Sequence, residues 1–283
     1  MPTLINIRNI LVGLSEEALK DETSDAVAYG LSLSIAAGAH LTVQAASRRL
    51  VMNSALAGDY GRALVADENR RVAELSQAFA DRVRSDAALA GVTCKVESPQ
   101  LPPSDILTAF AAKARLNDLI VLDAERRTID LDRELIEATL FRSGRPVIVV
   151  PPGHGSFTGR RVVVAWDGGR EAARAVNDAL PFLQTAEAVE IISVVGEKVI
   201  PTSVSGAELA PHLARHGIIV TVKDVVLEHP GDVAEILRTE TAAYRADMMV
   251  MGGHQHGPIR QWIFGGLTQS FMRVCPIPLF LAH

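Results

Sequence analysis

Short apolar runs alternate with longer amphipathic segments along the whole chain. The apolar runs are rich in Val, Ile and Leu and are bounded by small or polar residues, which is typical of buried strands. The segments between them repeat apolar residues at helical spacing. This alternation predicts an α/β fold in which helices cover both faces of a parallel sheet.

The same order of elements occurs twice. The corresponding segments are 6–15 with 159–168, 24–46 with 171–195, 91–98 with 217–226, 102–124 with 229–253, and 141–152 with 272–283. Each half therefore predicts the order β-α-β-α-β-α-β-α-β, with a sheet of its own. The second crossover helix is long in the first half (58–89) and shorter in the second (205–216). The proline- and glycine-rich segment 151–161 separates the halves, which gives domains 1–152 and 153–283.

Composition and charge restrict the class of protein. The 283 residues are 48% hydrophobic and carry a net charge of −5. The residues before Pro151 hold 17 basic and 20 acidic side chains, and the rest hold 11 and 13, so the halves carry −3 and −2. Neither half is a basic nucleic-acid-binding module. No segment has the roughly 20 consecutive apolar residues of a membrane span. The amino terminus lacks a secretory leader pattern, so we expect a cytoplasmic protein.

Two cysteines, Cys94 and Cys275, fall in different halves and form no CxxC or metal-binding pattern. We interpret both as small core residues rather than redox groups.

The last structured stretch combines a strand, a glycine loop and a helix. An apolar run, 248–251, ends in Gly252 and Gly253, and Gly265 and Gly266 open an amphipathic helix further on. Glycines allow the backbone to approach a ligand closely, and the amides at a helix start favour negative charge. This stretch therefore predicts a site for a phosphate or another anion.

Together these features resemble a tandem universal stress protein. Residues 162–183 look like the first strand and helix of that family, and residues 251–272 look like its glycine loop and last helix. The resemblance implies two tandem flavodoxin-like (Rossmann-like) units, each a doubly wound parallel five-stranded sheet of the kind seen in adenine nucleotide alpha hydrolases. It also implies a role in stress response. The last strand is commonly the dimer edge in the family, so we expect a homodimer or an intramolecular pseudo-dimer of the two halves.

The nucleotide signature of the family is only half kept. Gly252 and Gly265 match its first and third glycines, but Gln255 stands at the second glycine and Gly266 replaces the hydroxyl residue. A glutamine adopts positive φ only at a steric cost. Gly257 and Thr268 lie close by but out of register.

The resemblance implies an adenine nucleotide such as ATP, with Mg²⁺, in the second half. Adenine would lie near Asp167 and Val194, and the phosphates would lie over the glycine loop and the helix start. The residues expected to bind it are Asp167, Val194, Gly252, Gly253, His254, Gly265, Gly266, Leu267 and Thr268. For Asp167, a turn or helix-cap role before Gly168 is an equally open interpretation.

The first half has lost these features. Ser15 stands in the place of Asp167, and no glycine loop follows the strand that ends at 123. Acidic side chains would crowd negative charge where a phosphate must bind; they are Asp123, Glu125, Asp130, Asp132 and Glu134. We therefore predict no nucleotide in the first half.

No catalytic constellation is apparent. Ser193, Ser203 and Ser205 lie outside any G-x-S-x-G elbow, and no paired carboxylates end two strands of the second half. Histidines occur in pairs, His254 with His256 and His212 with His216, but no third ligand is spaced to complete a metal site. Three hypotheses remain: a regulatory protein that binds an adenine nucleotide, a structural or partner-binding protein with vestigial pockets, and a slow nucleotide hydrolase whose base is not identified.

Overall fold

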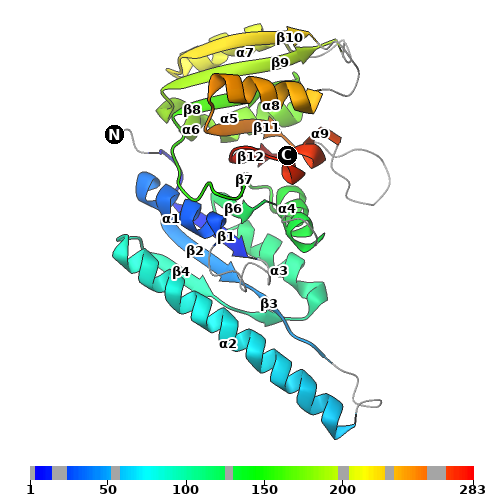
Figure 1. Cartoon of the computed structure of the whole chain (residues 1–283). Helices are drawn as coiled ribbons and strands as arrows, with labels where there is room; N and C mark the ends of the chain where they lie inside the picture. The colour runs from blue at the N-terminus through cyan, green and yellow to red at the C-terminus, as the bar shows by residue number, and fades with distance from the viewer. Residues whose placement is uncertain are drawn as a thin grey trace.

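The computed structural model describes residues 4–14, 24–51, 58–124, 130–196, 204–226, 233–253 and 266–283. Within these ranges strands and helices alternate in each half, as the hydrophobic pattern predicts (Figure 1). The first half contains β1 (Asn9–Leu14), α1 (Asp25–Ala37), β2 (His40–Ala45), β3 (Ser47–Arg48), α2 (Asp59–Leu89), β4 (Cys94–Glu97), β5 (Gln100–Leu101), α3 (Pro103–Ala114), β6 (Leu119–Asp123), α4 (Asp130–Ser143) and β7 (Val147–Val150). The second half contains β8 (Arg161–Ala165), α5 (Arg170–Asp178), α6 (Leu180–Thr185), β9 (Ala188–Val195), α7 (Gly206–Arg215), β10 (Val220–Val226), α8 (Val233–Tyr244), β11 (Met248–Gly252), α9 (Gly266–Arg273) and β12 (Leu279–Ala282).

Both halves have the same strand order. The sheet runs β10-β9-β8-β11-β12-β7-β6-β1-β2-β4, so each half, numbered along its own five strands, has the order 3-2-1-4-5. Neighbouring strands within a half are parallel. The two doubly wound parallel units predicted from the repeat are confirmed. The short strands β3 and β5 form a separate two-stranded sheet in the first half.

The expectation of two separate sheets needs a correction. The last strand of each half pairs with the other, β12 with β7, in the antiparallel direction, with Leu281 opposite Val147. The result is one ten-stranded sheet whose strand direction reverses at the junction. Each half thereby covers the open edge of the other, and the predicted intramolecular pseudo-dimer is present.

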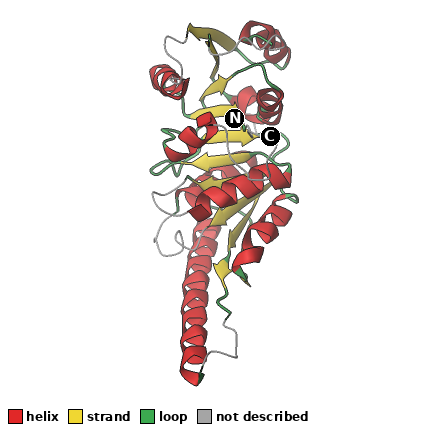
Figure 2. Ribbon diagram, turned by 90° about the vertical axis from the view of Figure 1, so that its right-hand side faces the viewer, coloured by secondary structure: helices red, strands yellow, loops and turns green. Residues whose placement is uncertain are grey.

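A layer of helices and a continuous apolar core cover each face of this sheet (Figure 2). On one face the core includes residues of α1, α2, α5, α6 and α7, and on the other it includes residues of α3, α4, α8 and α9. Alternate residues of each strand belong to opposite layers; in β12, Phe280 lies in the first and Leu281 in the second. Both layers contain residues from both halves, so the core is continuous across the junction.

A row of aromatic rings crosses the junction on the first face. Tyr29 of α1 meets Phe157 of the connecting segment, Phe157 meets Phe182 of α6, and Phe182 meets Phe280 of β12. The centroid separations are 5.8, 5.8 and 5.6 Å, with edge-to-face geometry. The Phe157 amide also donates to Ser32 Oγ at 3.1 Å, which fixes the connecting segment against α1. Through Phe157, the segment between the domains packs against the core.

One hydrogen-bond motif recurs in both halves. Asp118, just before β6, accepts from the amides of Arg8 and Asn9, each at 2.9 Å. Asp247, just before β11, accepts from the amides of Arg160 and Arg161 at 2.9 and 3.1 Å. In each half the aspartate ties the start of the fourth strand to the start of the first, so the internal repeat extends to individual side-chain contacts.

The long helix expected at the second crossover is α2, and only part of it covers the sheet. All its buried residues lie from Val72 onward, and its amino-terminal turns project beyond the body of the molecule (Figures 1 and 2). Those turns carry exposed apolar side chains, Tyr60 and Leu64. No helix in the described ranges is long and apolar enough to cross a membrane.

The two cysteines differ in environment. Cys275 is buried and its thiol donates to the Ile277 carbonyl at 2.6 Å, and burial raises its pKa to about 12. Cys94 on β4 is only partly buried, and burial raises its pKa as well. The interpretation as a core residue therefore holds for Cys275, whereas Cys94 lies at the edge of the sheet.

We expect Phe182→Ala to lower the free energy of unfolding by about 3–5 kcal/mol, because it removes a fully buried ring that contacts both the connecting segment and β12. Urea denaturation followed by circular dichroism measures this change. Tyr60→Ala, at a residue 79% exposed, is the matched control and should leave the midpoint unchanged. Equal effects of the two substitutions would contradict the role of the aromatic row.

Candidate functional site

Three of the expected site residues, Asp167, Val194 and Gly252, lie at or just after the carboxyl ends of three adjacent strands of the second half. In β8, Ala165 pairs with Met251 of β11 on one side and with Ile192 of β9 on the other. Asp167 follows β8 by two residues and Gly252 ends β11, so they lie at the same edge of the sheet. The chain crosses to β9 on one side of β8 and to β11 on the other, and ligands of open α/β sheets bind at such a switch point.

Asp167 closes a tight turn at the start of α5. Its Oδ1 accepts from the Gly169 amide at 2.8 Å, and Gly168 between them has a φ of +74°, which favours glycine. The turn role considered from the sequence is therefore present. The side chain stays exposed at the surface of the crevice. On the neighbouring strand Val194 is half-buried.

Trp166, next to Asp167, belongs to the core. It is 7% exposed, and its indole nitrogen donates to the Val204 carbonyl at 2.7 Å. Trp166 therefore has a packing role.

Gly252 lies directly against the first turn of α5. A Cβ at this position would stand 2.6 Å from both the Ala172 amide nitrogen and the Glu171 carbonyl carbon. Backbone cannot move aside as the end of a side chain can, so only glycine fits here. The close approach expected of this glycine is therefore to the chain's own helix.

Gly253 is bound into the sheet. Its amide donates to the Ala282 carbonyl at 2.8 Å, and its carbonyl accepts from His283 Nδ1 at 2.9 Å. A Cβ here would meet Leu140 of α4 at 2.6 Å. The Gly253 amide is therefore hydrogen-bonded to β12, beside the junction of the two halves, and it does not face an anion.

The last helix, α9, begins at Gly266, which is exposed and has no atom within 4 Å of a Cβ built on it. Leu267 is half-buried and Thr268 is 1% exposed, so the threonine faces the protein interior. The loop residues His254 and Gly265 lie outside the described residues, as do Gln255, His256 and Gly257.

In the first half a carboxylate occupies the position of Gly252. Asp123 ends β6 as Gly252 ends β11, and it accepts from Ser24 Oγ at 2.7 Å and from the Ala26 amide at 3.0 Å. Ser24 is the N-cap of α1, and its hydroxyl also accepts from the Val27 amide. The start of α1 is therefore covered by an anion of the protein itself.

From the sequence we placed Asp123 among the acidic residues that would repel a phosphate, and we did not predict its contact with the start of α1. Two features of the sequence could have predicted this contact. Asp123 aligns with Gly252 in the repeat, and Ser24 stands at the predicted start of the first helix. Of the other acids, Asp132 is buried and Glu134 is exposed, whereas Glu125 lies outside the described residues, as does Ser15.

Among the described residues, no group of three or more His, Cys, Asp or Glu side chains could hold a metal ion. The ring centroids of His212 and His216 lie 4.9 Å apart in edge-to-face geometry, and both side chains are exposed at the end of α7. Ser205 is the N-cap of α7, in a capping box with Glu208, and Ser193 is buried.

Comparisons with known proteins agree with this geometry. Residues 159–283 match the family model described as the universal stress protein family. The match covers the second half of the chain, from the segment before β8 to the end of β12.

Solved structures extend the likeness of the fold to the first half. A universal stress protein from Archaeoglobus fulgidus DSM 4304 is 17% identical, with a TM-score of 0.68, and the match covers 98% of this chain and 99% of that one. A putative universal stress protein from Pseudomonas aeruginosa UCBPP-PA14 is 16% identical, with a TM-score of 0.59, over 99% and 94% of the two chains. None of the curated proteins compared with the chain matches it. The whole chain thus has the tandem fold of these universal stress proteins.

We expect Gly252→Ala to lower the free energy of unfolding by about 1–3 kcal/mol, because the added methyl group forces the start of α5 away from β11. Gly266→Ala is the matched control: it adds the same methyl group in open space at a helix start, where alanine favours the helix. Thermal unfolding of the two variants measures the difference. A stable Gly252→Ala variant with unchanged unfolding would contradict the close approach.

Asp123→Ala should lower the free energy of unfolding by about 1–3 kcal/mol, because it leaves the Ser24 hydroxyl and the Ala26 amide without their acceptor in a buried place. Asp67→Ala, which removes an exposed ion pair with Arg70 on α2, should cost no more than about 1 kcal/mol. Urea titrations measure both values. An Asp123→Ala variant as stable as the control would show that this carboxylate does not stabilise the start of α1.

Proposed function

We propose that the protein is a non-catalytic regulatory protein of the stress response whose second half binds an adenine nucleotide such as ATP. The observation that carries the proposal is the contrast between Gly252 and Asp123. In the first half the carboxylate of Asp123 covers the start of α1, whereas the corresponding position in the second half has no side chain. A phosphate at the end of β11 therefore meets no carboxylate from that strand, so the second half suits a phosphate better than the first.

The proposed ligand spans the switch point. Adenine lies toward Asp167 and Val194, where the exposed carboxylate accepts a hydrogen bond from the exocyclic amino group. The phosphates, with Mg²⁺, lie near Gly252 and the start of α9 at Gly266, with His254 and Gly265 supplied by the loop. Leu267 and Thr268, which are more buried, support the helix start from behind. Gly253 supports the site by fixing β11 to β12 rather than by donating to a phosphate.

A second candidate function is a partner-binding protein with vestigial pockets. It is favoured by Gln255 and Gly266, which depart from the nucleotide signature, and by the Gly253 amide, which is already bound to β12. In that case the crevice stays empty and the outer surface carries the function. A folded protein that binds no nucleotide would favour it.

No described group is placed as a general base beside the crevice, so any turnover of ATP is proposed to be slow. From the sequence we also propose a cytoplasmic location. Homodimer formation remains part of the proposal too, and the pairing of β7 with β12 means that it must use a surface other than the last strand.

Calorimetric titration with ATP, in the presence and absence of Mg²⁺, tests nucleotide binding. We expect one site per chain. Asp167→Ala should weaken affinity by about 5–30-fold because it removes the acceptor for the amino group. Asp167→Asn keeps a side-chain oxygen for both the turn and the adenine and should stay within about threefold of the unsubstituted protein.

Asp224→Ala, on the exposed edge strand β10, is the control and should leave affinity unchanged. Thermal unfolding of each variant shows whether it is folded. The absence of heat at millimolar ATP, for protein that unfolds cooperatively, would reject nucleotide binding.

A further inference from the structure

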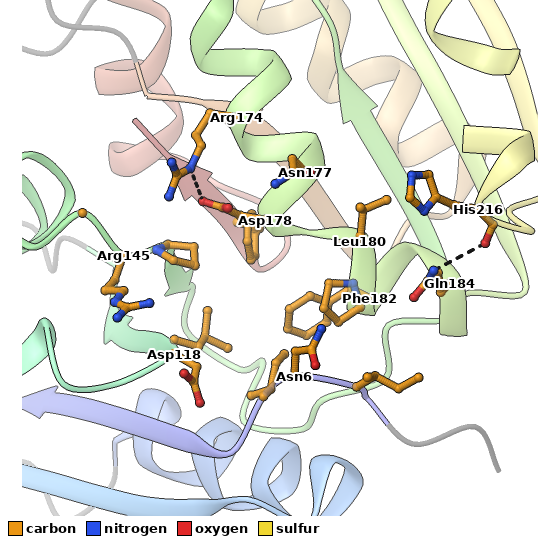
Figure 3. Close-up of a pocket in the computed structure, with 17 residues that line it drawn as sticks. Asn6, Asp118, Arg145, Arg174, Asn177, Asp178, Leu180, Phe182, Gln184 and His216 are labelled. Carbon is orange, nitrogen blue, oxygen red and sulfur yellow. Dashed lines mark hydrogen bonds and ion pairs between the residues drawn. The ribbon is translucent and has the colours of Figure 1, made fainter. Parts of the chain in front are cut away.

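A cavity lies where the two halves meet, on the face of the sheet that carries α5 and α6 (Figure 3). Its volume is about 470 Å³, within the range of cavities that bind small organic molecules. The first half supplies the segment before β1, the start of β6 and the turn before β7, and the second half supplies α5, α6 and the end of α7. The cavity therefore exists only because the two halves are joined.

The lining is apolar at the base and polar around the rim. Leu119, Phe182 and Phe280 are buried and form part of the base, and Ile5, which is 62% exposed, lies at the rim. The apolar surface that a bound molecule can reach comes from Ile5 and from the half-buried Leu180 and Pro181. The polar side chains that line the cavity are Asn6, Asp118, Arg145, Arg174, Asn177, Asp178, Gln184 and His216.

The carboxylates of this rim are already engaged within the protein. Asp178 accepts from Arg174 Nε at 2.7 Å on the same helix, and Asp118 accepts from the main-chain amides before β1. Asp178 is therefore paired with a cation and Asp118 is held by neutral amides, and neither contact depends on a ligand.

Arg145 differs from these groups. Its Nε and Nη2 donate to the Arg115 carbonyl at 3.3 and 3.2 Å, and among the described residues it forms no ion pair with a carboxylate. Figure 3 shows Arg145 and Arg174 on the same side of the cavity, opposite Gln184 and His216. This side of the cavity therefore holds a guanidinium whose charge is not balanced by a carboxylate.

We propose that the cavity binds a small organic anion with a flat apolar body, such as an aromatic carboxylate or sulfonate. The anionic group pairs with the Arg145 guanidinium, which presents a planar set of donors suited to such oxygens. The apolar body rests on the half-buried Leu180 and Pro181, with Ile5 at the rim. Because both halves contact the ligand, binding also stabilises the folded chain. This site is independent of the proposed nucleotide crevice and of its outcome.

The test uses the full chain and two fluorescent probes with the same aromatic body. The first is 8-anilinonaphthalene-1-sulfonate, and the second is N-phenyl-1-naphthylamine, which lacks the sulfonate. We expect the sulfonate probe to bind at one saturable site. Arg145→Gln should weaken its binding by about tenfold, as expected for loss of a hydrogen bond to a charged group, and should leave binding of the uncharged probe unchanged.

Arg70→Gln, which makes the same charge change on the exposed surface of α2, is the matched control and should affect neither probe. Asn177→Phe, at an exposed residue of α5 that lines the cavity, should weaken binding of both probes by filling the space. The proposal would be overturned if Arg145→Gln and Arg70→Gln weakened binding of the sulfonate probe equally. It would also be overturned if a folded Asn177→Phe variant bound both probes as well as the unsubstituted protein.

Discussion

The antiparallel pairing of β7 with β12 is the contact on which the rest of the structure depends. Without it, each half would expose the main-chain groups of its fifth strand and the apolar side chains on both sides of that strand. With it, the two sheets become one, and the core layer on each face continues from one half into the other. Phe182 and Phe280 close this junction from one side, and Leu140, packed against Gly253, closes it from the other. The connecting segment contributes the half-buried Phe157, which packs against this core.

This pairing also determines where ligands can bind. Strand direction reverses at the junction, so the carboxyl ends of the two sets of strands, and hence the two crevices, face opposite edges of the sheet. The crevices have diverged at one residue in particular. The Asp123 carboxylate accepts a hydrogen bond from the amide of Ala26 at the start of α1, whereas Gly252 lets β11 lie directly against α5. The cavity beside Arg145 and Phe182 belongs to neither crevice, because residues of both halves form it.

Much of the fold follows from the sequence alone. Val- and Ile-rich runs between amphipathic helices specify parallel strands, and their recurrence specifies two units of the same order. The repeat does not specify how the units meet, because an apolar last strand fits a partner chain as well as the other half of its own chain. That choice depends on the packing of Phe157 and Phe182, which hydrophobic periodicity does not reveal.

The site was predicted less completely. The sequence places Asp167 and Gly252 at one edge of the sheet because carboxyl ends of parallel strands coincide. It does not show that the Gly253 amide is bound to Ala282, or that Asp123 binds the start of α1, because both contacts join segments far apart in the chain. A glycine or an aspartate at a strand end has several structural uses, and only the neighbouring backbone distinguishes them.

Hydrogen exchange at the junction tests the account most directly. If β7 and β12 hold the two halves together as one cooperative unit, the amides of Val147–Val150 and Leu279–Ala282 should exchange only through global unfolding, as slowly as the central strands β1 and β8. Exchange of these junction amides through an opening that leaves β1 and β8 protected would contradict it, and would show that the halves fold as separate domains.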